Sequence, residues 1–200
     1  MNSKSKIILP RGYLSWGQFN LWRKNKEQYK KQYFFGEEGY HGKEMDYGKR
    51  LADHIENGGE ESEAIKMLAT LLPKYSKVEH RVEAYLGDIL LKGSIDTFNP
   101  RNLAFGEYKT GKVPWTQAKV DKHGQLTMYQ LILYLQKEKL VKDIWLHWAE
   151  TRNEGSSDIE LTGKIESFRT ERSMGDIVYF AREVRKSAEE ISNEWKKLIA

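Results

Sequence analysis

The chain has 200 residues, 39% of them hydrophobic and 31% charged, and a net charge of +4, as expected for a soluble globular protein. It contains no cysteine, which excludes disulfides, thiolate zinc sites, iron–sulfur clusters and cysteine nucleophiles. No apolar run approaches the ~20 residues that span a bilayer, so we expect a cytoplasmic protein without a membrane partner.

The first third of the chain predicts an arm followed by helices. We expect a single domain over residues 1–200, with residues 1–14 as a flexible arm. Aromatic residues at helical spacing after Ser15 predict a helix over residues 15–34, whose basic face favours either nucleic-acid binding or plain solvation. Two shorter helices are predicted over residues 46–57 and about 60–72, because Gly58-Gly59 and Pro73 end them.

The pattern then changes to alternating apolar and polar residues, which predicts strands. Gly87-Asp88 and Asn99-Pro100 mark turns between them. The predicted elements are strands over residues 77–86, 88–97, 103–109, 142–151 and 158–167, a loop over 110–122, and helices over 123–138 and 171–198. This order predicts an α/β fold with a mixed central sheet flanked by helices.

Two acidic residues and a lysine stand at related positions of two neighbouring strands. Asp96 lies near the end of one, and Glu107 and Lys109 share a face of the next because strand side chains alternate. If the strands pair as a hairpin, the two carboxylates come together and need a cation between them. Hard oxygen ligands suit Mg²⁺, with the backbone carbonyl of Tyr108 as a further ligand, and Lys109 would orient water or stabilise transition-state charge. A surface salt-bridge cluster is the alternative.

These residues belong to a longer pattern that resembles the PD-(D/E)XK nuclease superfamily, in its RecB-like and phage exonuclease branch. Residues 14–135 carry the resemblance, through the segments Gly93-Ser94-Ile95-Asp96, Glu107-Tyr108-Lys109-Thr110 and Gln125-Leu126-Thr127-Met128-Tyr129. The resemblance implies a restriction-endonuclease-like core. It implies that Asp96 and Glu107 bind the metal and that Lys109 is catalytic.

The same resemblance assigns supporting residues. Glu79 matches a glutamate that commonly starts the strand before the hairpin. Gln125 and Tyr129 are expected to face the active site, where Gln125 holds Lys109 or a DNA phosphate; the alternative is an amide and an aromatic ring satisfied inside the core. In the second helix, family members often carry a histidine ligand four residues after a glycine, but this chain has Ala52 at that position.

Other residues are candidates for completing the site. Glu56 lies one helical turn after the position of the missing histidine and is a candidate third carboxylate ligand, with a solvent-exposed glutamate as the alternative. In the loop after the catalytic strand, Lys112, Trp115 and Lys119 are candidates to contact DNA, and Trp115 could stack on a base. The alternative is that Trp115 packs as an anchor of the loop.

The sequence thus predicts a Mg²⁺-dependent deoxyribonuclease that hydrolyses phosphodiester bonds, with Mn²⁺ expected to substitute. By resemblance it is a phage-type exonuclease of recombination, repair or DNA end-processing, in a bacterial or phage-infected cell. It would act on DNA as a monomer, as a homo-oligomer or with a recombination partner protein. Two alternatives stay open: a non-catalytic DNA-binding or assembly subunit that retains the fold, and a metal-dependent hydrolase of another phosphoester.

Overall fold

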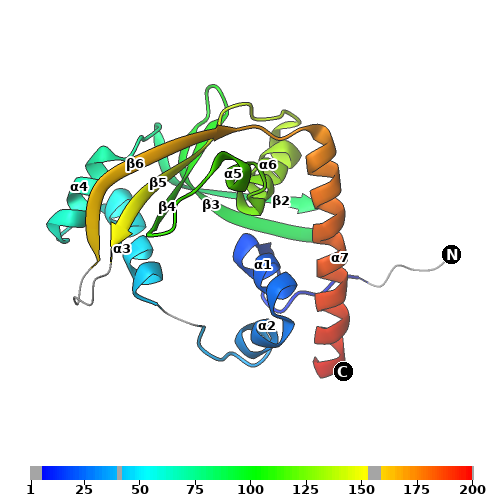
Figure 1. Cartoon of the computed structure of the whole chain (residues 1–200). Helices are drawn as coiled ribbons and strands as arrows, with labels where there is room; N and C mark the ends of the chain where they lie inside the picture. Colours follow the sequence, from blue (N-terminus) through cyan, green and yellow to red (C-terminus); the bar gives the residue numbers. More distant parts are fainter. Residues whose placement is uncertain (1–5, 40–41, 153–158, 200) are drawn as a thin grey trace.

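Six strands of the described residues form one mixed sheet with helices on both of its faces (Figure 1). The computed structural model describes residues 6–39, 42–152 and 159–199. The strands are β1 (Leu14–Ser15), β2 (Lys77–Leu86), β3 (Ile89–Asn99), β4 (Ala104–Gly111), β5 (Ile144–Arg152) and β6 (Glu160–Thr170). This arrangement confirms the predicted α/β fold class.

The sheet combines antiparallel hairpins with one long parallel pair. β2 and β3 form an antiparallel hairpin through the turn at Gly87, where a positive φ of 66° suits glycine. β4 and β5 run parallel, which requires a crossover connection, and α5 (Gln117–Asp121) and α6 (Gly124–Lys137) supply it. β6 pairs antiparallel with β5. The short helix α5 falls inside the stretch predicted as a loop.

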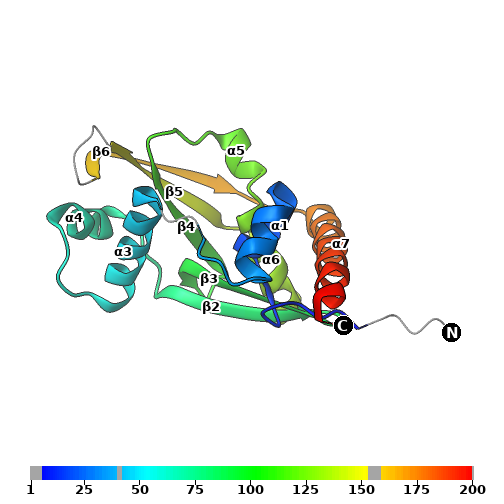
Figure 2. The ribbon, with the colours of Figure 1, turned by 90° about the horizontal axis from the view of Figure 1, so that it is seen from below.

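Two groups of helices cover the two faces of the sheet (Figure 2). On one face α6 lies against the sheet, with α7 (Met174–Ile199) and α1 (Trp16–Lys24) packed beside it. Leu126, Leu131 and Ile132 of α6 are fully or almost fully buried there. On the other face α3 (Lys43–Asn57) and α4 (Glu63–Leu71) form a smaller apolar cluster with β5 and β6. None of the helices in the described residues combines the length and apolar character needed to cross a bilayer.

The helix predicted over residues 15–34 is two helices, α1 and α2 (Lys26–Tyr33). Asn25 separates them, because its backbone is extended at φ −155° and its side chain accepts a hydrogen bond from the N–H of Gln28 at 2.9 Å. The asparagine therefore ends one helix and caps the next. Helical spacing of the aromatic residues persists across the break, which is why the periodicity alone did not reveal it.

The predicted flexible arm is wrong for residues 6–14, and residues 1–5 lie outside the described residues. Leu9 and Leu14 are buried in the main core. The N–H groups of Ile7 and Ile8 donate to Asp88 and to Ser192 of α7, at 3.2 Å and 2.9 Å. β1 then pairs in parallel with β3. The packing of this segment could not be predicted from local patterns, because its partners on β3 and α7 lie far away in sequence.

Candidate active site

The candidate site lies where strands β3 and β4 separate. They pair over only three positions, Thr97–Asn99 with Ala104–Gly106, and β4 then continues beside β5 as far as Gly111. Across the opening, the carboxylate of Asp96 accepts a hydrogen bond from the backbone N–H of Tyr108 at 2.5 Å. The structure therefore brings Asp96 to the segment that carries Glu107 and Lys109, as the sequence predicted.

Lys109 is held in place by a chain of polar side chains. Its ammonium donates to Glu107 Oε1 at 2.6 Å and to Gln125 Oε1 at 2.9 Å. The amide nitrogen of Gln125 in turn donates to the hydroxyl of Tyr129 at 2.8 Å, one turn further along α6. Gln125 thus contacts Lys109, as expected, and Tyr129 orients Gln125. Tyr108 points to the opposite side of the strand, where its hydroxyl donates to the carbonyl of Pro73 at 2.7 Å.

The charges of this cluster lie in a poorly solvated environment. Burial, and next the charge of Glu107, raises the pKa of Asp96 well above its usual range. Burial also raises the pKa of Glu107, which is only 2% exposed. Burial opposes the charge of Lys109 too, but Glu107 and Asp96 outweigh it and raise the pKa of the ammonium. Lys109 is therefore protonated at neutral pH. Its single positive charge faces two buried carboxyl groups, so it does not balance both of them when they are ionised.

Glu79 lines the same opening from β2, between the residues of β2 that pair with Thr97 and Ile95. Its carboxylate accepts a hydrogen bond from the hydroxyl of Ser94 at 2.8 Å, and its backbone has a φ of 44°. A non-glycine residue in this left-handed region costs about 1–2 kcal/mol, so the strain lies beside the site. Burial raises the pKa of Glu79 as well. Ser94 was not predicted as a site residue, although its position two residues before Asp96 places both on one strand face.

A cavity of about 400 Å³ opens onto these carboxylates, with α3 as its other wall. Ala52 lines it, so the position that carries histidine in the resembling family does face the site. Glu56 differs from expectation: its carboxylate lies 3.9 Å from the guanidinium of Arg81 on β2. Glu56 lies one helical turn after Ala52, and its side chain points toward β2. Glu56 is not among the residues that line the cavity. That lining comprises Glu44, Met45, Gly48, Lys49, Leu51, Ala52, Glu79, Asp96, Glu107, Tyr108, Lys109 and Thr110.

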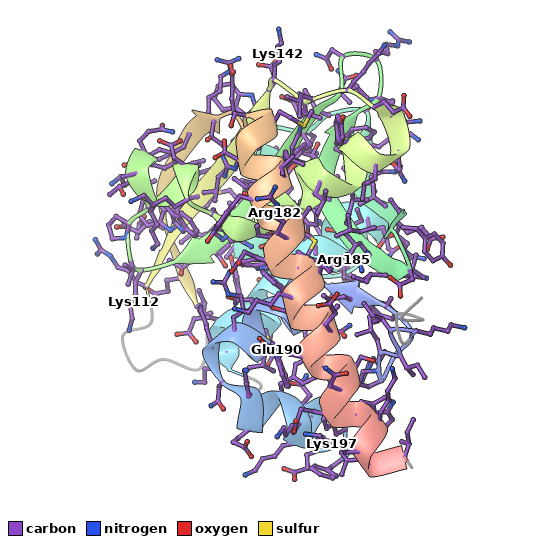
Figure 3. The ribbon with its side chains drawn as sticks, turned by 90° about the vertical axis from the view of Figure 1, so that its right-hand side faces the viewer. Lys112, Lys142, Arg182, Arg185, Glu190 and Lys197 are labelled. Carbon is purple, nitrogen blue, oxygen red and sulfur yellow. The ribbon has the colours of Figure 1, made fainter. Side chains whose placement is uncertain are left out.

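The three residues expected to contact DNA follow β4: Lys112 and Trp115 lie in the connecting loop and Lys119 lies in α5. Trp115 is half-buried and its ring packs edge-on against His123, with 4.9 Å between ring centroids. The ammonium of Lys119 lies 4.4 Å from the centre of the Trp115 ring. These contacts match the alternative in which Trp115 anchors the loop. Lys112 is exposed, and Figure 3 shows it projecting from the side of the molecule.

The donor set fits a hard divalent cation. Glu107 Oε2 is buried and has no hydrogen-bond partner among the described residues, so one oxygen of a buried carboxylate is left for another ligand. Asp96 contributes a second carboxylate in a place that disfavours its charge. Carboxylate and carbonyl oxygens are the ligands that Mg²⁺ accepts. Within the described ranges, no three acidic, histidine or cysteine side chains gather as a preformed metal cage.

Comparison with solved structures gives the fold an independent identification. The chain matches a candidate exonuclease from Eubacterium rectale with a TM-score of 0.65 and 11% identity, over 92% of this chain and 83% of that one. It matches a phage-related exonuclease from Haemophilus somnus 129PT with a TM-score of 0.54 and 16% identity, over 87% of this chain and 82% of that one. No protein-family model and no curated protein sequence matches. The chain therefore shares the fold of these two proteins, in agreement with the fold that the sequence resemblance implied.

Proposed function

We propose that this protein is a Mg²⁺-dependent deoxyribonuclease, and specifically a phage-type exonuclease that processes DNA ends in recombination or repair. The observation that carries the proposal is the meeting of Asp96, Glu107 and Lys109 where β3 and β4 separate. In a salt-bridge cluster of purely structural value the buried carboxylate oxygens are normally paired, whereas Glu107 Oε2 has no hydrogen-bond partner among the described residues. The names of the two structural neighbours support the choice of an exonuclease.

The residues of the site have separate parts in the proposed reaction. Asp96, Glu107 and the backbone carbonyl of Tyr108 would hold Mg²⁺, for which Mn²⁺ should substitute. The chemistry that the ion supplies when bound is neutralisation of the negative charge on the phosphate. Lys109 remains protonated, and two of its three N–H donors are engaged by Glu107 and Gln125. The third can donate to the attacking water or to a phosphate oxygen, where charge grows in the transition state.

The proposal is tested by incubating the purified protein with linear and closed circular DNA, in Mg²⁺, in Mn²⁺ and in EDTA. We expect linear DNA to be degraded in either metal and to survive in EDTA. Nicking of closed circles would instead identify an endonuclease. Binding of DNA without cleavage in either metal would favour the non-catalytic subunit, and cleavage of other phosphoesters alone would favour a different hydrolase.

Two substitutions test the assignment of the site. Lys109→Ala and Asp96→Asn should each lower the cleavage rate by at least about 100-fold while the far-UV circular dichroism spectrum stays unchanged. Lys197→Ala is a matched control, because Lys197 also pairs with a glutamate, at 2.7 Å, but is 71% exposed on the last turn of α7 (Figure 3). A Lys109→Ala protein that cuts at the wild-type rate would show that the site is wrong.

A further inference from the structure

A guanidinium group is buried outside the site, in the connection between β6 and α7. Arg172 is 5% exposed and donates five hydrogen bonds, as many as it has N–H groups. Its acceptors are hydroxyl and carbonyl oxygens, and none of the five is a carboxylate. Burial accordingly lowers the pKa of Arg172. In Figure 1 this connection runs above α5 and α6.

Three of the five acceptors belong to one short stretch, the junction of α5 and α6. Nη2 of Arg172 donates to the carbonyls of Val120 and His123, at 3.1 Å and 3.3 Å, and Nε donates to Thr127 Oγ1 at 2.8 Å. Val120 lies at the end of α5, His123 is the N-cap of α6, and Thr127 is in the first turns of α6. A buried charge without an ion pair costs stability, and an apolar side chain could fill the same volume. The guanidinium is therefore suited to fixing the geometry of this junction.

The fixed junction also carries the partner of the catalytic lysine. Gln125 stands between His123 and Thr127, and its Oε1 accepts from Lys109 at 2.9 Å. A shift of α6 along or around its axis would move this amide oxygen away from the ammonium. We propose that Arg172 is a positioning residue for cleavage, which acts through the first turn of α6 and Gln125 on Lys109. This inference rests on the proposed nuclease function.

A double-mutant cycle distinguishes positioning through Gln125 from a general role in folding. The cleavage rate at saturating DNA and Mg²⁺ is measured for the wild type, Arg172→Lys, Gln125→Ala and the double variant. We expect Arg172→Lys, which keeps the charge but loses the fork of donors, to lower the rate about tenfold. In the Gln125→Ala background the same change should lower it by no more than about twofold, because the route to Lys109 is already broken.

Arg169→Lys is the matched control, three residues earlier in the chain. Arg169 is 47% exposed and pairs with Asp143 and Glu171 at the surface. The Arg169→Lys variant should cleave DNA at a rate within about twofold of its parent, both with and without Gln125→Ala. If Arg172→Lys does not fold, Thr127→Val replaces it in the cycle, because it removes the acceptor of Arg172 Nε while keeping the shape of the side chain.

Equal fold losses in the two backgrounds, or a wild-type rate for Arg172→Lys, would show that Arg172 does not act through Gln125. If Thr127→Val is used instead, an equal loss of cleavage rate with and without Gln125→Ala would lead to the same conclusion. Such results leave the nuclease itself intact, since the wild type still cleaves. A wild-type protein that fails to cleave under all metal conditions overturns the proposed function and the positioning role together.

Discussion

The surroundings of Asp96 disfavour the negative charge of its ionised carboxylate. Its carboxylate is buried near Glu107, and both causes raise its pKa. Asparagine has the same shape and keeps an oxygen that can accept the N–H of Tyr108. Asp96→Asn should therefore stabilise the metal-free protein, by about 1 kcal/mol or roughly 2–4 °C in the thermal midpoint, although it removes cleavage.

Thermal unfolding in EDTA and in Mg²⁺ checks this expectation. Mg²⁺ should raise the midpoint of the wild type, because it binds the folded state only, and should have little effect on Asp96→Asn. Asp143→Asn, at an exposed ion pair with Arg169, is the control and should leave the midpoint nearly unchanged. A lower midpoint for Asp96→Asn in EDTA would mean that the carboxylate contributes structural stability instead of strain.

The raised pKa of Asp96 also fixes a dependence of stability on pH. Its folded-state pKa lies above the ordinary value of 3.8, so the folded state binds the proton more tightly than the unfolded chain does. The stabilising contribution is complete below that ordinary value and is lost as the pH rises through the raised pKa. Relative to Asp96→Asn, the metal-free wild type should become progressively less stable as the pH rises from about 4 through the raised pKa of Asp96. Urea unfolding of both proteins in EDTA measures this pH dependence. A difference in the free energy of unfolding that stays constant with pH would show that the pKa of Asp96 is not raised.

The positions of the candidate site residues could be predicted because strand periodicity and a hairpin turn are local signals. Alternation placed Glu107 and Lys109 on one side of β4 and Tyr108 on the other, as their contacts now show. The left-handed backbone of Glu79 could not be predicted, since no pattern of residue types announces such strain. Arg172 was equally hidden, because all its partners except Thr170 and Glu171 lie more than forty residues away.

The contact of α6 with β3 depends on one glycine. A β-carbon on Gly93 would lie 2.6 Å from the ring of Tyr129, whose hydroxyl accepts from Gln125. Gly93→Ala should therefore push the ring aside, destabilise the protein by about 1–3 kcal/mol and lower the cleavage rate. Gly48, inside α3, has nothing within 4 Å of the corresponding position. Gly48→Ala should stabilise the protein by up to about 1 kcal/mol, through helix propensity.

Urea denaturation of the two alanine variants compares the same chemical change in two settings. The free energy of unfolding should move in opposite directions for Gly93→Ala and Gly48→Ala. A loss of similar size at both positions would show that the contact between Gly93 and Tyr129 is not what requires glycine on β3.

Helices and strands were predicted correctly where one local residue pattern determines the element. β2 was predicted over its observed residues, 77–86, because ten alternating residues end at a glycine turn. The break at Asn25 was missed, since an asparagine within a periodic stretch does not reveal whether it caps a new helix. Which strands pair in parallel was not predicted either, because β4 and β5 meet only after the chain has passed through α5 and α6.

The N-terminal segment connects α7 to the central sheet. Residues 6–15 pass from α7, where Lys196 donates to the carbonyl of Lys6 at 2.6 Å, to the sheet, where β1 pairs with β3. β1 and β4 thus share one edge of β3, at its two ends, and the opening between them contains Gly93 and Asp96. This arrangement could not be predicted, because a strand of two residues has no periodicity. The segment is consequently part of the scaffold around the site.

Truncating one side chain of this segment measures how far the fold depends on it. Leu14 is fully buried in the main core, so Leu14→Ala should cost about 2–5 kcal/mol of unfolding free energy. Ile8 lies in the same segment but is 39% exposed, and Ile8→Ala keeps the backbone N–H that donates to Ser192. It should cost less than about 1 kcal/mol. Urea unfolding of both variants decides between a packed segment and a flexible arm, because a flexible arm would make the two changes equally harmless.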